Sequence, residues 1–455
     1  MVRTLSLLGI SFFLLFLIAG RSRAYDAVVD VIKSNRSIGL TWFFLFLAKT
    51  IFVINFFQVS VFEPDYSSPI VQLVFVALAI LSLLSYLINN SVDYGFKDFT
   101  FHLLIIYAFF GLISSILSPK IDLAVYKISL VFIDCFLLAA TVGWQYAKKT
   151  RYPIFDALTI FAVCSLFGSL LGAFVLPSAA FKANPGPLGV MLFGLFPVLH
   201  ANELGMLASM GFLVFFVHFM MIDDLRSRLM NGSVLVMSAI VLFLAQSRTA
   251  IVATAIGIPI IFVFSGRRHL LRFIVFSFLA IFLCSFVVLV SELRNQELLS
   301  PLVQYLQRGQ NQSGLETLYG RFSLWMGLGL ELVQESPWFG AGFDVGVRFS
   351  ETSHFGHLHN SYFQVLANSG ILSFIPWFLF LWTILFRVFR RFWSSLKIKD
   401  PTDHKKYMAM KVFVACIPLV ARSFTGSVML NHSWSLMFFL ALFVEIKWLE
   451  AENKM

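Results

Sequence analysis

Long hydrophobic runs, separated by short polar stretches, recur along the whole chain. Each run holds roughly 20 residues, the length that an α-helix needs to cross ~30 Å of hydrocarbon. The strands of a membrane β-barrel would instead be alternating segments of ~10 residues, so the pattern indicates membrane-spanning helices. Twelve spans are predicted, near residues 38–61, 69–88, 99–118, 125–147, 154–176, 204–222, 233–246, 249–265, 270–290, 365–386, 411–430 and 433–448.

A further apolar stretch, "LSLLGISFFLLFLIAG", lies near the N-terminus and is short for a span. It resembles the hydrophobic part of a signal peptide, with "SRA" as a candidate cleavage site. Cleavage would leave the basic segment 21–37 outside, against the charge pattern of the other loops, so we favour an uncleaved additional or interfacial segment. The expected fold is therefore an all-α polytopic membrane protein with about 12 transmembrane helices, or 13 if this stretch also crosses.

The composition excludes an ordinary soluble domain. Hydrophobic residues make up 59% of the 455 positions and charged residues only 13%, whereas soluble domains carry about a quarter. The net charge of +10 lies mainly in short loops, as the positive-inside rule predicts, and no basic stripe with stacking aromatic residues indicates nucleic-acid binding. The four cysteines lie within apolar runs without CxxC spacing, which indicates neither a disulfide framework nor a metal site.

Lysine and arginine residues predict which loops are cytoplasmic. The basic loops at 148–153, 223–228, 266–272 and 387–411 are expected on that side, which leaves 291–362 as the only large outer loop. Four parts follow: an N-terminal hydrophobic segment with a basic cytoplasmic stretch (1–37), a helix bundle (38–290), the large outer loop (291–362), and C-terminal helices with a cytoplasmic tail (363–455).

The outer loop holds arginines but no lysine, and part of it is predicted to be helical. The helix runs from Thr317 to a stop at Ser336–Pro337, and it places Arg321 and Trp325 one turn apart on one face. Arg248 lies at a very short outer turn in "AQSRTAI". Two converging arginines would suit a diphosphate, since the guanidinium group matches phosphate oxygens bidentately; a snorkelling or paired structural arginine is the alternative for Arg248.

The stretch "HFGHLHNSYFQVLANSG" gathers three of the nine histidines just before a span. Zinc binding, interfacial histidines that solvate the start of the span, and a general base at the membrane surface are three interpretations. A neutral imidazole can accept a proton from a hydroxyl nucleophile at ambient pH, and His359 is the candidate nearest the span. Lys49 and Asp134 fall inside spans and could form a buried pair, whereas Arg422 could bind phosphate or pair structurally.

"LAQSRTAIVATAIG", "GRFSLWMGLGLELVQESPWFGAGFDVG" and "HLHNSYFQVLANSGILS" together resemble the O-antigen ligase and polymerase superfamily. "HANELG" at 200–205 resembles the Asn-containing loop of that family before a span. The resemblance is strongest over about 185–375. It implies a membrane-embedded (GT-C-like), metal-independent and inverting glycosyltransferase without cofactor, in the bacterial inner membrane, whose large loop with its short helices is periplasmic.

The resemblance also implies roles for individual residues. His359 would activate the acceptor hydroxyl, and Arg248 and Arg321 would bind the diphosphate, with Arg422 as a third cation. Groups would be positioned by four further residues, namely Asn202, Asn360, His357 and Trp325. The donor would be a glycan on polyprenyl (undecaprenyl) diphosphate, the acceptor lipid A-core or a growing glycan, and other polysaccharide-assembly proteins are possible partners.

Three rival functions remain open from the sequence. A polymerase of O-antigen or exopolysaccharide repeat units would use the same donor, and Ser373, where the ligase pattern has Gly, Thr or Tyr, leaves the acceptor undecided. A transporter, for instance of inorganic carbon, could use the charges inside the spans. A purely structural membrane subunit would leave the outer arginines and His359 without a role.

Overall fold

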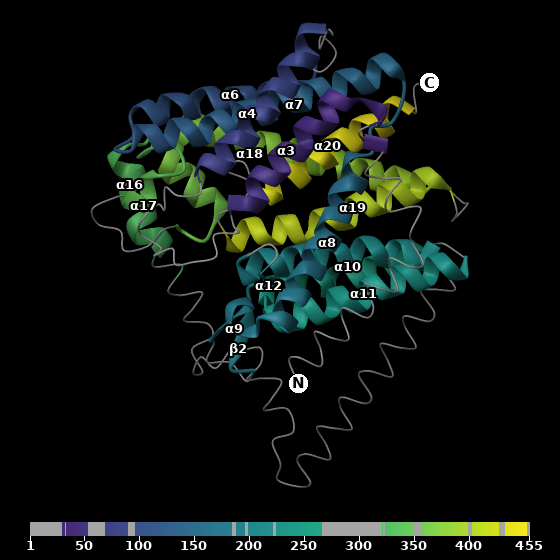
Figure 1. Cartoon of the computed structure of the whole chain (residues 1–455). Coiled ribbons are helices and arrows are strands. Elements are labelled where there is room, and N and C mark those ends of the chain that lie inside the picture. The colour runs from purple at the N-terminus through teal and green to yellow at the C-terminus, as the bar shows by residue number, and fades with distance from the viewer. Residues whose placement is uncertain are drawn as a thin grey trace. The chain divides into compact units, whose positions relative to one another are not determined.

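The computed structural model describes residues 30–52, 69–89, 96–183, 188–195, 199–221, 224–265, 321–349, 357–398, 403–426 and 433–452, except for residues 32, 322 and 323. Helices dominate these residues (Figure 1). The chain divides into two compact units, one of Met1–Arg21, Ala162–Thr317 and Phe392–Pro418, the other of Ser22–Phe161, Leu318–Arg391 and Leu419–Met455.

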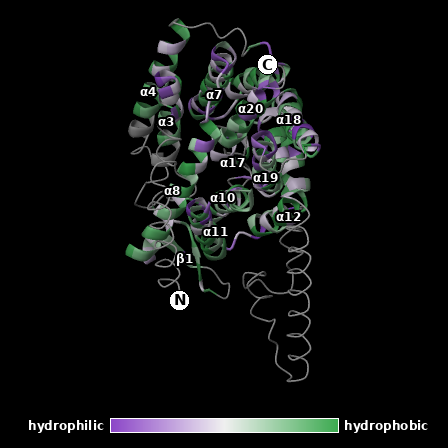
Figure 2. Ribbon diagram, turned by 90° about the vertical axis from the view of Figure 1, so that its right-hand side faces the viewer, coloured by the Kyte–Doolittle hydropathy of each residue, from purple (hydrophilic) through white to green (hydrophobic). Residues whose placement is uncertain are grey.

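Among the described residues, eight helices are long and apolar enough to cross a membrane. They are α6 (Phe99–Ile116), α7 (Ile121–Lys148), α8 (Ile154–Val175), α10 (Ala201–Met221), α11 (Leu225–Ala245), α12 (Arg248–Ser265), α18 (Ser361–Ser395) and α19 (His404–Thr425). The remaining long helices are α3 (Arg36–Phe52), α4 (Pro69–Asn89) and α20 (Trp434–Glu452). Hydrophobic residues cover much of α4 (Figure 2), as expected of a helix that faces lipid.

Eight of the twelve predicted spans are thereby confirmed as long apolar helices. The predicted spans at 38–61, 69–88 and 433–448 correspond to α3, α4 and α20, which are helical but do not meet the criterion for a full span within the described residues. The predicted span at 270–290, the N-terminal apolar stretch and His354 lie outside the described residues. The total of twelve, and the four-part division of the chain, stay predictions.

In the unit that contains residues 162–317, α10 packs against α11 and α12. A core of buried residues joins α10 and α12 to the end of α18 and the first part of α19; it consists of Leu213, Val217, Ile261, Phe392, Met410 and Val414. The short helix α9 (Pro177–Ala180) leads into a two-stranded antiparallel sheet of β1 (Phe181–Ala183) and β2 (Val190–Leu192), with Phe181 opposite Leu192.

In the other unit, α3 packs against α4 and α6 against α7. The outer-loop residues form η1, a π-helical turn at Trp325–Gly329, followed by α16 (Leu330–Glu335) and α17 (Gly346–Phe349). The predicted helical stop at Ser336–Pro337 is confirmed, because α16 ends at Glu335 and Ser336 leaves the helical conformation. The π-helical turn itself was not expected from the sequence.

Charged groups gather at one end of the helices of this second unit. Asp98, which caps α6, accepts from Arg387 Nη1 at 2.9 Å and from Lys447 Nζ at 2.8 Å. Arg151, between α7 and α8, pairs with Glu445 at 2.6 Å. The opposite ends of α6 and α7 contact the loop between α16 and α17, as described below. The loop at 148–153, predicted to be cytoplasmic, and the loop at 291–362, predicted to be on the outer side, thus lie at opposite ends of α6 and α7, as the charge pattern requires.

Candidate functional site

His359 stands immediately before the first turn of α18. Its φ of +53° is left-handed, a conformation that few residues other than glycine adopt, although His, Asn and Asp do so more often than most. Asn360 follows as the helix cap: its side-chain oxygen accepts from the backbone N–H groups of Tyr362 (2.9 Å) and Phe363 (3.2 Å). The cap fixes the N-terminal start of α18. The left-handed turn at His359 therefore sets the direction in which the His359 imidazole leaves the backbone.

Trp325 holds the residue that precedes His359. The indole Nε1 donates to the backbone carbonyl of Leu358 at 2.7 Å, and the indole stacks on the ring of Phe363 with 5.5 Å between centroids. On the other side of the same residue, the backbone N–H of Leu358 donates to Gln364 Oε1 at 2.7 Å. Both polar groups of the buried Leu358 are thus satisfied by side chains, and the loop is fixed on either side.

The rings of His357 and His359 contact each other. Their centroids lie 4.0 Å apart, with the ring planes inclined by 43°. His357 is exposed, whereas His359 is partly buried. The two imidazoles thus lie side by side immediately before α18.

The end of α19 is tied to the start of α18. Asn360 Nδ2 donates to the carbonyl of Phe424 at 3.2 Å, and Ser361 Oγ donates to the carbonyl of Gly426 at 2.8 Å. Phe424 lies in the last turn of α19 and Gly426 directly after it, where no helical N–H remains to bind these carbonyls. Asn360 therefore serves two helices with one amide.

Arg422 lies in this last turn of α19 and is 9% exposed. Its Nη1 donates to the carbonyl of Thr425 at 3.1 Å, and a cation is favourable at the C-terminal end of a helix. The guanidinium covers Gly426 closely: a Cβ atom built there would lie 2.3 Å from Nη1. The position of Arg422 thus depends on the absence of a side chain at residue 426.

α18 is interrupted ten residues after Asn360. Gly370 has φ +69° and ψ −178°, a conformation that is essentially restricted to glycine. The loop after α16 supplies the missing hydrogen bonds, since the carbonyl of Pro337 accepts from Ile371 N at 2.9 Å and Gly342 N donates to the carbonyl of Asn368 at 2.8 Å. The predicted span at 365–386 is therefore a broken helix that begins at Ser361.

The loop at the break is also anchored to α6 and α7. Lys127 Nζ pairs with Asp344 Oδ2 at 2.7 Å and donates to its backbone carbonyl at 2.9 Å. Phe343 is buried against Tyr107 of α6, with 5.9 Å between ring centroids. Ser114 Oγ of α6 donates to the carbonyl of Asn368 at 2.9 Å. The loop thus reaches into the helices. Lys127 and Asn368 were not predicted from the sequence, because their partners lie more than 200 residues away along the chain. Gln364 was not predicted either, although its partner Leu358 is only six residues away.

Arg248 and Asn202 lie in the other unit, at the turn between α11 and α12. The turn consists of Gln246, which has φ +50°, and Ser247. Ser247 Oγ donates to Asn202 Oδ1 at 3.3 Å. Asn202 is in the first turn of α10, so the expectation that it lies in a loop before the helix is wrong: α10 begins at Ala201, earlier than the predicted 204.

Gly205 explains why α10 can approach this turn. A Cβ atom there would lie 2.4 Å from the Cβ of Ser247, so only glycine permits the contact. Arg248 is the first residue of α12 and is partly buried. A cation at a helix N-terminus opposes the helix dipole, which indicates a role for Arg248 other than stabilising its own helix.

The structure therefore places the predicted site residues in two groups. Trp325, His357, His359, Asn360 and Arg422 meet around the start of α18, and Arg321, which is helical and partly buried, precedes Trp325 by four residues. Asn202 and Arg248 meet at the turn of the other unit. Their predicted roles remain predictions. Among the described residues no three His, Cys, Asp or Glu side chains are grouped as metal ligands, and His354 is outside that set.

The eight long apolar helices within the described ranges define the class: the chain is a multi-pass α-helical membrane protein. Residues 233–378 match the family model described as O-antigen ligase, a range that holds Arg248, Arg321, Trp325, His357, His359 and Asn360. The match covers less than half of the chain. It supports a relationship of this part of the chain to the O-antigen ligase superfamily, and such a domain implies a glycosyltransferase-like enzyme of the ligase or polymerase kind. Asn202 and Arg422 lie outside the matched range. No curated protein matches the chain.

Proposed function

We propose that the protein transfers a glycan from polyprenyl (undecaprenyl) diphosphate to an acceptor hydroxyl at the periplasmic face of the bacterial inner membrane, as an O-antigen ligase in lipopolysaccharide assembly. The observation that carries this proposal is the left-handed His359, held between its Trp325-bound neighbour and the Asn360 cap that also binds the end of α19. Such pre-organisation is expected where a base must meet a hydroxyl within hydrogen-bond distance.

The proposed chemistry is a single displacement. An imidazole nitrogen of His359 accepts the proton of the acceptor hydroxyl while the oxygen attacks the anomeric carbon. The bond between that carbon and the diphosphate oxygen breaks, the diphosphate leaves with the electron pair, and the configuration inverts. No metal or cofactor is required, because arginine side chains neutralise the leaving group.

Three arginines are proposed for the diphosphate. Arg422 is the one whose placement beside the start of α18 supports this role most directly, because it lies in the turn that Asn360 and Ser361 bind. Arg321 precedes the Trp325 that fixes the loop before His359. Arg248 carries its charge at a helix N-terminus, an unfavourable position unless an anion or an acidic group faces it.

A repeat-unit polymerase is the second candidate, because the family match covers both kinds of transfer. It would use the same donor and the same base, and would differ only in an acceptor that is itself carrier-linked. A transporter is the third candidate; one observation in its favour is the broken helix α18, since discontinuous helices line the binding sites of many carriers.

Surface glycans separate the three candidates. A strain that lacks the protein is complemented with the wild type, with His359→Ala or with His102→Ala, a control histidine that is exposed on α6. A ligase predicts bare lipid A-core and long chains retained on the carrier in the His359→Ala strain, whereas a polymerase predicts single repeats. Glycans that are unchanged in the deletion strain would exclude both enzymes and direct attention to transport assays.

A further inference from the structure

Gln364, the fourth residue of α18, binds the main chain on both sides of His359. Its side-chain Oε1 accepts from the backbone N–H of Leu358 at 2.7 Å, and its own backbone N–H donates to the carbonyl of Asn360 at 3.0 Å. Leu358 and Asn360 are the two neighbours of His359 in the sequence. A single glutamine thus closes a ring of hydrogen bonds around the turn that carries the imidazole.

The side-chain bond of Gln364 resembles a capping box but reaches further back. In a capping box, a Glu or Gln at the third helical position accepts the N–H of the cap residue itself. Here the glutamine is the fourth helical residue, and its oxygen reaches Leu358, two residues before the Asn360 cap. His359 lies between these two residues with φ +53°, a conformation that persists only where the surroundings hold it.

Leu358 can transmit this contact because its other groups are also held. It is fully buried in an apolar cluster that includes Leu332 and Val347, and its carbonyl accepts from Trp325 Nε1 at 2.7 Å. Gln364 is only 3% exposed, so its bond to Leu358 is shielded from water. Without the glutamine oxygen, the buried N–H of Leu358 would lose its acceptor, and the chain before His359 would shift to recover one.

We propose that Gln364 is a positioning residue for glycan transfer: by fixing Leu358, it sets the place from which the His359 imidazole meets the acceptor hydroxyl. The inference rests on the proposed function, in which His359 is the base. A base acts only within hydrogen-bond distance of the hydroxyl, and a displacement of about 1 Å can cost about a hundredfold in rate. Binding of the donor does not depend on this placement, so the loss is expected in kcat and not in KM.

Gln364→Met tests this role, because methionine keeps an unbranched side chain of similar length and lacks the acceptor oxygen. With the purified full chain, a polyprenyl-diphosphate-linked glycan and lipid A-core, kcat should fall roughly 10- to 100-fold, while KM for the donor stays within about twofold. Gln364→Glu keeps an acceptor oxygen near a helix N-terminus, where a negative charge is favourable, so its kcat should stay within about threefold of the wild type. Equal losses in the two variants would overturn the assignment to the acceptor oxygen.

Gln145→Met is the matched control in the same unit. Gln145 of α7 is also 3% exposed, and its Nε2 donates to the main-chain carbonyl of Val444 at 3.1 Å. The variant removes one buried bond between a glutamine and the main chain, without a contact to the residues around His359. Its kcat should equal that of the wild type, and a loss as large as that of Gln364→Met would overturn the inference.

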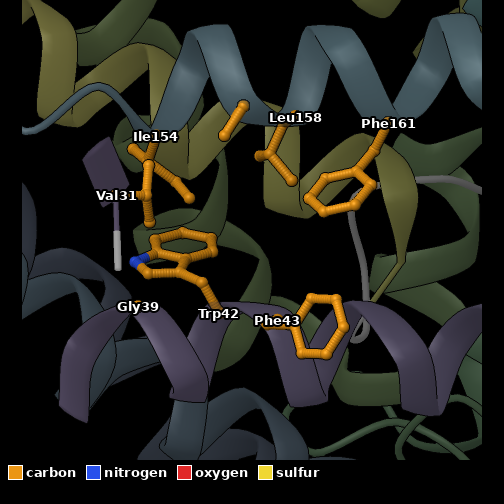
Figure 3. Close-up of a pocket in the computed structure, with 8 residues that line it drawn as sticks. Val31, Gly39, Trp42, Phe43, Ile154, Leu158 and Phe161 are labelled. Atoms are coloured by element: carbon orange, nitrogen blue, oxygen red, sulfur yellow. The ribbon is translucent and has the colours of Figure 1, made fainter. Parts of the chain in front are cut away.

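Two tryptophans provide a second matched pair. Trp325→Phe frees the carbonyl of Leu358 and should lower kcat as Gln364→Met does, because both bonds hold the same residue. Trp42 likewise donates from Nε1 to one partner, Thr141 Oγ1, at 3.1 Å. Figure 3 shows its indole in the small apolar pocket between α3 and α8. Trp42→Phe should therefore keep the kcat of the wild type.

The reaction of His359 with diethyl pyrocarbonate gives a readout that does not depend on activity. Peptide mass spectrometry should show His359 modified roughly threefold faster in Gln364→Met, because the loop opens more often, and at the wild-type rate in Gln145→Met. If the wild type transfers no glycan, the proposed function fails, and the modification rates alone decide whether Gln364 fixes His359. An unchanged kcat or an unchanged modification rate in Gln364→Met would overturn the inference.

Discussion

Replacing Gly370 with alanine tests whether the break in α18 is required for the site at its start. The new Cβ would lie 2.3 Å from the carbonyl oxygen of Trp338, a backbone atom that cannot rotate away. The φ of +69° adds conformational strain of about 1–3 kcal/mol for a residue with a side chain. Relieving the collision requires a shift of packed backbone, which costs about 1–3 kcal/mol more. Gly370→Ala is therefore expected to destabilise the protein by about 2–6 kcal/mol, a large part of the stability of a typical domain.

Two other glycines separate the causes of this loss. Gly327 lies in the π-helical turn, and a Cβ there would meet nothing within 4 Å, so Gly327→Ala should leave the melting temperature unchanged or raise it slightly. Gly189 also has a positive φ, +67°, but a Cβ there would meet nothing within 4 Å. Gly189→Ala should therefore lower the free energy of unfolding by about 1–2 kcal/mol, from backbone strain alone and without a collision. Melting of the three purified variants in one detergent gives the order. If Gly370→Ala has the same melting temperature as Gly327→Ala, the conclusion that residue 370 must be glycine for α18 to break there is refuted.

Three further predictions concern charged groups. Gly426→Ala should lower glycan transfer with little change in melting temperature, because its Cβ displaces the guanidinium end of Arg422 rather than backbone. Lys127→Met should destabilise the protein by about 1–3 kcal/mol by leaving the carboxylate of Asp344 partly buried without its cation, and adding Asp344→Asn should restore part of the loss. Burial would raise the pKa of Asp98, but its two basic partners hold this pKa below the usual value. Its contribution to stability is thus complete above the unfolded pKa of about 3.9 and is lost as the pH falls below that value, so it should be constant between pH 5 and 8.

Each of these three predictions has a comparison that can contradict it. Gly232→Ala suits the first, because a Cβ there would make only an ordinary contact with Phe219 at 3.6 Å, and equal activities of the two alanine variants would contradict the prediction. For the pair of Lys127 and Asp344, the prediction would be contradicted if the double variant Lys127→Met, Asp344→Asn were no more stable than Lys127→Met alone. For Asp98, the melting temperature of Asp98→Asn should fall less steeply than that of the wild type from pH 5 to pH 3.

The hydrophobic pattern predicted the long helices because each must satisfy its backbone hydrogen bonds within a single apolar segment. The same pattern could not place their ends. α18 begins at Ser361 because Asn360 caps it, and a cap is set by one side chain rather than by hydropathy. The pattern likewise could not show the break at Gly370, since a glycine in an apolar run is usually compatible with an unbroken helix.

The residues around His359 were found from the order of short motifs, and their contacts explain part of that order. The spacing between Trp325 and His359 reflects a hydrogen bond to Leu358, and the glycine ten residues after Asn360 reflects the insertion of a loop into α18. Gln364 and Lys127 carried no comparable signal. Each is a polar residue at one edge of an apolar run, and its partner could be identified only in three dimensions.

The most direct test of the account is glycan transfer by the purified chain from a polyprenyl-diphosphate-linked glycan to a lipid A-core acceptor, in the presence of a chelator. The wild type should release polyprenyl diphosphate and form one product with inverted anomeric configuration, and His102→Ala should match it. His359→Ala should lose transfer by about 10²–10⁴-fold while it melts as the wild type does. Transfer that survives His359→Ala undiminished, or that proceeds with retention of configuration, would contradict the account.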